Sequence, residues 1–290
     1  GIEVLNMHPL LIDRPDLVPD KIHPEKQGSG IIAKRLYQQV VQPFDSEFDV
    51  FKNFKQPFTV SNFKGYVCAD FQLNGRECKV VKPKKAAIGH PWIWRARFWA
   101  HEPQTDIALL ERGFHLVYCD QSELMGNEQA VNEWNKFYKL LTNARLGKKA
   151  VLEGMSRGAV YVFNWAAENP DNVAAVYVDN PLLDCKAMFT GHNGEEKPDN
   201  EVSISITKSY HVTREQMKIF NQSPIDKIDK IVKGKYPILI LCAELDKEAV
   251  NSQNAFPFEK KIKDKGGDIT VIVKEGFGHH PHSFPNPELI

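Results

Sequence analysis

The chain has 290 residues, of which 42% are hydrophobic and 26% charged, which is ordinary globular composition. Lysine plus arginine and aspartate plus glutamate each number 37, and this zero net charge argues against a nucleic-acid-binding protein, which needs an excess of basic residues. Apolar runs are all too short to span a bilayer, so we expect no membrane insertion.

The first 64 residues are rich in proline, aspartate and lysine, and only the stretch 31–41 has a helical pattern. We expect residues 1–64 to form an N-terminal extension packed on a main domain of residues 65–290. The chain begins with Gly1, so we expect any targeting segment to have been removed and the compartment to stay unreadable from these residues.

The main domain opens with a predicted β-hairpin over 66–82, turning at Asn74-Gly75. A two-residue turn at that point sets Cys68 opposite Val81 and not opposite another cysteine. The five cysteines are odd in number, and we expect buried, reduced thiols rather than a disulfide framework.

Strand-like and helical patterns then alternate along the chain. Strands are predicted over 88–94, 114–120, 150–155, 173–178, 237–242 and 269–273. Helices are predicted over 103–112, 127–145, 158–168 and 256–265. This alternation predicts an α/β fold with a mostly parallel sheet, an N-terminal antiparallel hairpin and helices on both faces.

The segment Gly154-Met155-Ser156-Arg157-Gly158 fits the pattern G-x-S-x-G. The pattern alone is common, and the alternative is an ordinary, non-catalytic turn between a strand and a helix. Here an apolar strand precedes it and an apolar helix follows, which is the setting of a nucleophile elbow. We expect a Cβ at either glycine to clash with neighbouring backbone in so tight a turn.

A serine nucleophile needs a base with an acid behind it. Asp246 follows the predicted strand 237–242, and His279 follows the strand 269–273 in a glycine-flanked loop. Two alternatives stay open: His280 in place of His279 as the base, and Asp184 in place of Asp246 as the acid.

In these three motifs, over residues 65–290, the chain resembles the α/β-hydrolase superfamily. The resemblance implies Ser156 as nucleophile, Asp246 as acid and His279 as base. It also implies an oxyanion hole formed by the backbone of Arg157 and of the loop near Trp94 and Arg95. The Ser156-Arg157 pair partly resembles the elbow of glucuronoyl esterases, although Gly158 stands one position earlier here.

Residues 82–101 carry five basic and no acidic residues, interleaved with aromatic ones. Aromatic faces pack on sugar rings and arginines hold carboxylates, so we expect Trp92, Arg95, Arg97 and Arg157 to bind substrate. The alternative is that the tryptophans are core and the lysines solvated. The block 91–113 resembles an α/β-hydrolase type of pectin methylesterase, which implies polysaccharide degradation and a periplasmic or secreted location.

The stretch 182–222 lies where this fold inserts its lid, and its polar character argues against long-chain lipid substrates. We therefore expect a serine esterase acting on an oligosaccharide or polysaccharide, most specifically on methyl esters of uronic acids. The alternatives are an acetyl-carbohydrate or general carboxylesterase, a prolyl-oligopeptidase-like peptidase, and a binding module without catalysis. No cofactor is expected, and no metal site, because no metal-ligand spacing accompanies His279, His280 and His282.

Overall fold

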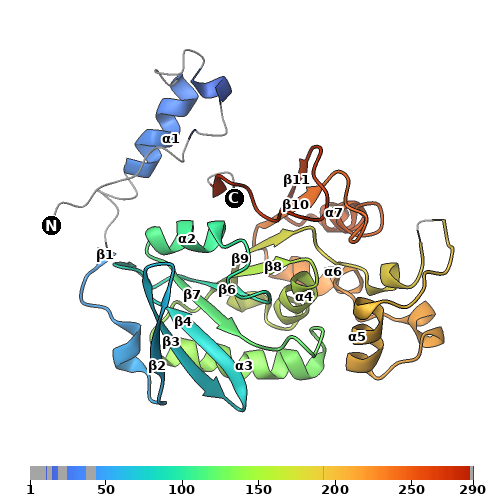
Figure 1. The fold of residues 1–290 in the computed structure, drawn as a ribbon, viewed down its shortest axis with the longest axis horizontal. Helices are drawn as coiled ribbons and strands as arrows, with labels where there is room; N and C mark the ends of the chain where they lie inside the picture. Colours follow the sequence, from blue (N-terminus) through green and yellow to red (C-terminus); the bar gives the residue numbers. More distant parts are fainter. Residues whose placement is uncertain (1–10, 12–14, 19–24, 37–43, 192, 288–289) are drawn as a thin grey trace.

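The computed structural model describes residues 11, 15–18, 25–36, 44–191, 193–287 and 290 (Figure 1). Its centre is a nine-stranded sheet in the order β11-β10-β9-β8-β6-β7-β4-β3-β2. These strands are β2 (Thr59–Phe63), β3 (Tyr66–Leu73), β4 (Arg76–Val81), β6 (Trp92–Arg95), β7 (His115–Cys119), β8 (Ala150–Met155), β9 (Val173–Asp179), β10 (Ile238–Ala243) and β11 (Ile269–Lys274). From β7 to β11 all neighbours are parallel, whereas β2, β3, β4 and β7 pair antiparallel. The expected mostly parallel sheet with an antiparallel hairpin is thus confirmed.

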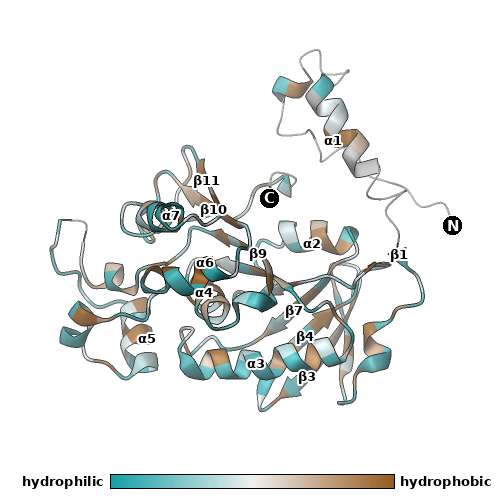
Figure 2. Cartoon of the chain, turned by 180° about the vertical axis from the view of Figure 1, so that it is seen from behind, coloured by the Kyte–Doolittle hydropathy of each residue, from teal (hydrophilic) through white to brown (hydrophobic). Residues whose placement is uncertain are grey.

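Helices cover both faces of this sheet (Figure 1). The α-helices are α1 (Lys26–Leu36), α2 (Gln104–Glu111), α3 (Glu128–Asn143), α4 (Gly158–Glu168), α5 (Glu201–Tyr210), α6 (Ile228–Lys233) and α7 (Ala255–Asp264). Short 3-10 turns are η2 (Pro15–Leu17), η4 (Val50–Asn53), η5 (Pro170–Asn172), η6 (Cys185–Met188), η7 (Glu215–Ile219) and η8 (Pro224–Asp226). Figure 2 shows hydrophobic strands in the interior and hydrophilic stretches on the outer side of helices such as α3.

The β6 strand shows how the two faces are separated. Trp92 and Trp94 belong to the large core beneath α3, α4 and α7, while Ile93 packs with Leu110 of α2 on the opposite face. This alternation is what a strand buried on both sides requires. The strand predicted over 88–94 begins only at Trp92, because Gly89 and His90 turn the chain with φ of 85° and 51°.

The hairpin register is as predicted, with Cys68 opposite Val81 across β3 and β4. All five cysteines are buried free thiols, as expected. Cys78 and Cys119 are cross-strand partners in β4 and β7, a pairing that the hairpin turn alone does not specify.

The segment before the hairpin is tied to the main sheet. The two-residue strand β1 (Phe44–Asp45) pairs with β5 (Ala86–Ala87), and β2 pairs with β3. Val50 lies in the main core. The helix expected over 31–41 is observed as α1, which starts earlier, and residues 37–41 of that prediction lie outside the described residues.

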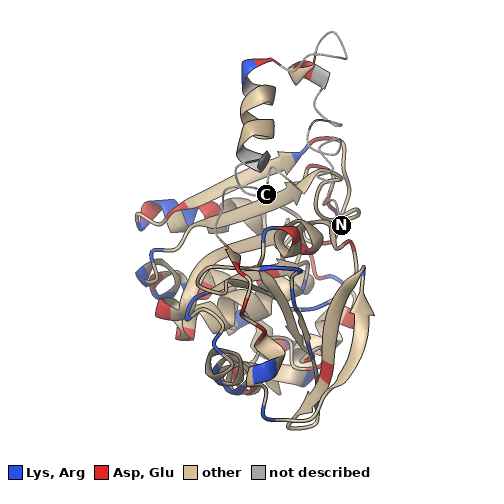
Figure 3. Cartoon of the chain, turned by 90° about the vertical axis from the view of Figure 1, so that its left-hand side faces the viewer, with Lys and Arg blue, Asp and Glu red and all other residues tan. Residues whose placement is uncertain are grey.

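The insertion over 182–222 contains α5, η6 and η7 and has its own small apolar core. Met188, Phe189, Ile206 and Met217 pack there with Met125 of the main body. Figure 3 shows basic and acidic residues interspersed on the outer helices and loops, in keeping with the neutral total. Within the described residues, no helix combines the length and apolar character needed to cross a membrane.

Candidate active site

The loop between β8 and α4 holds Ser156 in a strained conformation, with φ of 49°. Its backbone N–H donates to the carbonyl of Asp179 at 2.9 Å, which fixes the turn to the end of β9. A Cβ on Gly154 would lie 2.8 Å from the backbone nitrogen of Ala159, so only glycine fits there. At Gly158 the expected clash is wrong, because a Cβ would meet nothing nearer than the Cβ atoms of Ala96 and Arg97 at 3.7 Å.

The fold brings Ser156, His279 and Asp246 together from the ends of three parallel strands. His279 Nε2 lies 3.0 Å from Ser156 Oγ, and His279 Nδ1 lies 2.8 Å from Asp246 Oδ2. The other carboxylate oxygen of Asp246 accepts hydrogen bonds from the backbone N–H groups of Glu248 and Ala249, at 2.8 and 3.0 Å. The three side chains therefore form one continuous hydrogen-bonded chain.

The charges and hydrogen bonds around His279 favour one tautomer of its imidazole ring. Burial would raise the pKa of Asp246, but its hydrogen bonds from His279 and two backbone amides hold that pKa below the ordinary value. Burial would likewise lower the pKa of His279, yet the hydrogen bond and charge of Asp246 outweigh it and raise that pKa. An ionised Asp246 accepts the Nδ1 proton, and the Nε2 lone pair then faces the Ser156 hydroxyl.

The two alternative residues lie elsewhere. His280 is exposed, and its ring packs edge-on against those of His101, His279 and His282 at 4.9 to 5.8 Å between ring centroids. Asp184 accepts the backbone N–H of Lys186 at 3.0 Å at the start of η6. Neither side chain joins the hydrogen-bonded chain of Ser156.

Asn180 is a positioning residue that the sequence analysis missed. It directly follows β9, and its side-chain amide donates to the carbonyl of His279 at 2.6 Å. Its side-chain oxygen accepts the backbone N–H of Ala243 at 2.7 Å. Asn180 therefore holds the histidine loop against the end of β10. The only signal in the sequence was a polar residue at the end of a buried strand.

Two backbone N–H groups at or beside the elbow have no acceptor among the described residues and are candidate donors to an oxyanion. The N–H of Arg157, at the start of α4, donates to no acceptor in the described part of the chain. The expected partner near Trp94 and Arg95 needs correction, because both residues lie within β6, which pairs on both sides. The backbone N–H of Ala96 donates to the backbone carbonyl of Glu153 at 2.9 Å. The next backbone N–H, that of Arg97, has no acceptor among the described residues.

The side chains of Trp92 and Arg95 do not face a substrate, contrary to the expectation that they bind one. Trp92 is fully buried and donates through its indole N–H to a backbone carbonyl. Arg95 is 1% exposed, and its guanidinium lies 2.6 Å from Asp106 of α2 and 3.6 Å from Glu153. Burial, only partly offset by the charge of Arg95, raises the pKa of Glu153 well above its ordinary value.

Arg97 and Arg157 differ in their access to the nucleophile. The guanidinium of Arg97 stacks near Phe98 and donates to the carbonyl of Ser122, so it is turned into the protein. Arg157 pairs with the exposed Glu201 of α5 at 2.9 Å. Of the four side chains expected to bind substrate, only that of Arg157 lines the cavity beside Ser156.

This cavity has a volume of about 380 Å³ and lies between the elbow, the insertion and the loop after β10. Its lining residues are Ser156, Arg157, Leu182, Met188, Lys197, Asn200, Glu201, Val202, Lys247, Glu248, Ala249 and His279. Lys247 is exposed and has no ion-pair partner among the described residues. The cavity is therefore small, and most of its lining surface is apolar although most of its lining residues are polar or charged.

Comparison with known proteins finds similarity of structure only. No family model matches the chain, and neither does any curated protein. An S-formylglutathione hydrolase from Agrobacterium tumefaciens matches with a TM-score of 0.57 and 14% identity, over 78% of this chain and 93% of that one. The enzyme of the same name from Staphylococcus aureus matches with a TM-score of 0.55 and 13% identity, over 74% and 92%.

A puromycin-hydrolyzing peptidase from Mycobacterium tuberculosis matches with a TM-score of 0.56 and 13% identity, over 74% of this chain. The chain spans 36% of that peptidase and between 33% and 38% of three other long chains that it matches. At such identities the likeness shows the fold alone. Together with the sheet order, it confirms the expected α/β-hydrolase fold.

Proposed function

We propose that this protein is a serine hydrolase that cleaves carboxylic esters through an acyl-enzyme, with Ser156 as nucleophile, His279 as base and Asp246 as acid. The observation that carries the proposal is the position of His279, which is hydrogen-bonded to both Ser156 and Asp246. An α/β-hydrolase fold with such a triad at its strand ends is suited to acyl transfer.

In the first step Ser156 Oγ attacks the carbonyl carbon of the ester, and its proton passes to Nε2 of His279. The negative charge that develops on the carbonyl oxygen is stabilised by the N–H groups of Arg157 and Arg97. The alkoxide leaves with the proton from His279. A water molecule that His279 deprotonates then attacks the acyl-enzyme, and the carboxylic acid departs.

For the substrate, we retain methyl esters of uronic acids in a polysaccharide as the specific proposal. Trp92 and Arg95 no longer support it, because both are buried. Its remaining support is the cavity wall, where Lys247, which has no ion-pair partner in the described part of the chain, and the half-buried Arg157 offer contacts to neighbouring carboxylates of an acidic polymer. Acetylated sugars, and proline amides as for a prolyl-oligopeptidase-like peptidase, are the competing substrates.

The test begins with a fluorophosphonate probe, which labels only an activated serine. We expect labelling of the wild type, none of Ser156→Ala, and undiminished labelling of Ser205→Ala, which removes a serine hydroxyl from the outer part of α5. Absence of labelling in the folded wild type refutes the serine-hydrolase proposal and favours a binding module.

The substrate is tested separately by methanol release from methyl-esterified galacturonan, against release of acetate from acetylated xylan and of amine from a proline amide. We expect methanol release that Lys247→Gln slows by raising KM, whereas Lys263→Gln on α7 leaves KM unchanged. A labelled enzyme that releases acetate or amine but no methanol refutes the uronate ester alone.

A further inference from the structure

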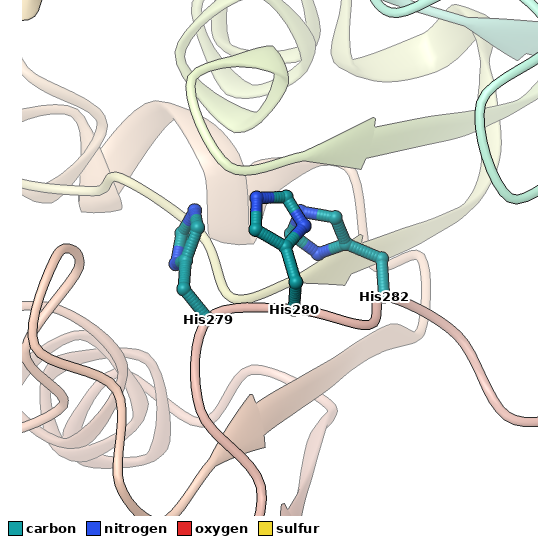
Figure 4. Close-up of side chains that lie close together, drawn as sticks. All are labelled: His279, His280 and His282. Carbon is teal, nitrogen blue, oxygen red and sulfur yellow. The ribbon is translucent and has the colours of Figure 1, made fainter.

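Two loops that carry histidines meet beside the candidate active site. The loop after β6 carries His101 and Glu102, and the loop after β11 carries His280 and His282. In the set His101, Glu102 and His280, the ligand atoms all lie within 4.8 Å of one another. His279, His280 and His282 form a second such set, and Figure 4 shows their rings pointing from one loop toward the strand ends.

In the second set, both ring nitrogens of His279 already take part in hydrogen bonds. Its Nδ1 is bonded to Asp246 and its Nε2 to Ser156, so neither nitrogen is free for a ligand. His280 differs, because its exposed ring has no hydrogen-bond partner in the described part of the chain. Further candidate ligand atoms lie in His101 and Glu102 of the other loop and in His282 of the same loop.

The first set has the donors that a transition metal needs. His101 Nε2 lies 3.3 Å from Glu102 Oε2, and the same oxygen accepts the backbone N–H of His282 at 2.6 Å. Glu102 is thereby fixed to the loop of His280. Around a tetrahedral Zn²⁺ with bonds of about 2.0 Å, ligand atoms stand about 3.3 Å apart. The side chains of His101 and His280 are both exposed.

His282 supplies a second, independent observation. It is 2% exposed, and its Nδ1 lies 2.9 Å from a carboxylate oxygen of Asp179. That bond occupies Nδ1, and no described residue is hydrogen-bonded to Nε2. A carboxylate behind the far nitrogen of a histidine is the arrangement that orients metal ligands. The ring centroid of His282 lies 4.9 Å from that of His280 and 6.2 Å from that of His101.

We propose that His101, Glu102 and His280 form a binding site for a borderline divalent metal ion such as Zn²⁺, with His282 as the fourth ligand. Two or three nitrogen donors with one carboxylate suit Zn²⁺ better than Mg²⁺ or Ca²⁺. The ion would join the loop that carries Arg97 to the loop that carries His279 while leaving His279 in the triad. Local sequence spacing gave no sign of this, because the ligands come from two distant segments.

The test is Zn²⁺ binding to metal-stripped protein that carries no affinity tag, measured by calorimetry and by metal analysis after dialysis. We expect one Zn²⁺ per chain, and at least a tenfold loss of affinity in His101→Ala, Glu102→Gln and His280→Ala. The control is His211→Asn, which removes an exposed histidine at the end of α5 and should keep full affinity. Thermal unfolding of the same proteins should shift upward with Zn²⁺ only where the site is intact.

Fluorophosphonate labelling distinguishes the two histidine sets. With the ion on His101, Glu102 and His280, labelling of Ser156 continues at saturating Zn²⁺. The proposal is overturned if no saturable binding is found or if His280→Ala binds like the wild type. It is also overturned if Zn²⁺ blocks labelling equally in the wild type and in His101→Ala, because the ion then occupies His279.

Discussion

The two glycines of the elbow differ sharply in the space around them, and this predicts opposite outcomes for one chemical change. In Gly154→Ala the new Cβ would stand 2.8 Å from the Ala159 nitrogen and from the Gly158 carbonyl carbon, against 3.4 Å for ordinary contact. The start of α4 must therefore move away from β8 by about 0.6 Å. Overpacking of this kind costs about 1–3 kcal/mol, which corresponds to a fall in Tm of roughly 2–5 °C at this chain length.

The same displacement carries the N–H of Arg157 and the hydroxyl of Ser156 away from their positions. A misplacement near 1 Å can cost about 100-fold in rate, so we expect the rate of fluorophosphonate labelling to fall by about 10–100-fold in Gly154→Ala. Gly158→Ala is the matched control. Its Cβ makes only 3.7 Å contacts, and alanine favours helix over glycine by up to about 1 kcal/mol.

We therefore expect Gly158→Ala to keep the labelling rate and to be at least as stable as the wild type. Thermal unfolding and time-resolved labelling of both variants provide the measurement. If the two variants lose stability and reactivity equally, the difference in backbone proximity does not govern the elbow, and the reasoning is wrong.

Three further changes probe the site and the core. Asp246→Asn should lower kcat by about 10⁴-fold with little change in KM, because His279 then loses the partner that sets its tautomer; an unchanged kcat would point to another acid. Arg95→Met should lower stability by about 3–5 kcal/mol, because Asp106 stays buried without its cation; a stable variant with a raised KM would return Arg95 to the substrate site. Burial lowers the pKa of His115 to about 4, so the folded state binds its proton less readily than the unfolded chain. The contribution of His115 to the free energy of unfolding is therefore complete above about pH 6.5 and falls by about 3 kcal/mol as the pH drops to 4. His115→Gln should flatten that part of the plot of unfolding free energy against pH.

The elements that the sequence predicted correctly are those that depend on local pattern. The Asn74-Gly75 turn fixes the register of its hairpin, and Cys68 stands opposite Val81 as that register requires. The alternation of apolar strands and helices predicts the parallel sheet, because such strands must be covered on both faces. The elbow is also a local feature, since strand, turn and helix are consecutive in the chain.

The wrong expectations concern side chains whose surroundings come from distant segments. Arg95 stands in a basic, aromatic stretch that resembles an exposed rim, but Asp106 and Glu153 reach it from α2 and β8 and make it part of the interior. The expected oxyanion donors Trp94 and Arg95 lie inside β6, because the end of that strand is set by its neighbours β7 and β8 and not by its own residues.

The sequence by itself determined the order of elements and the residue types from which the proposed triad is built, because parallel strands present the loops after them at one edge of the sheet. Only the tertiary structure decided which histidine faces Ser156, and which arginine is buried. It alone set His101 and Glu102 beside His280. The physical reason is that a side chain's solvent access and partners depend on loops that come together only after the sheet has formed.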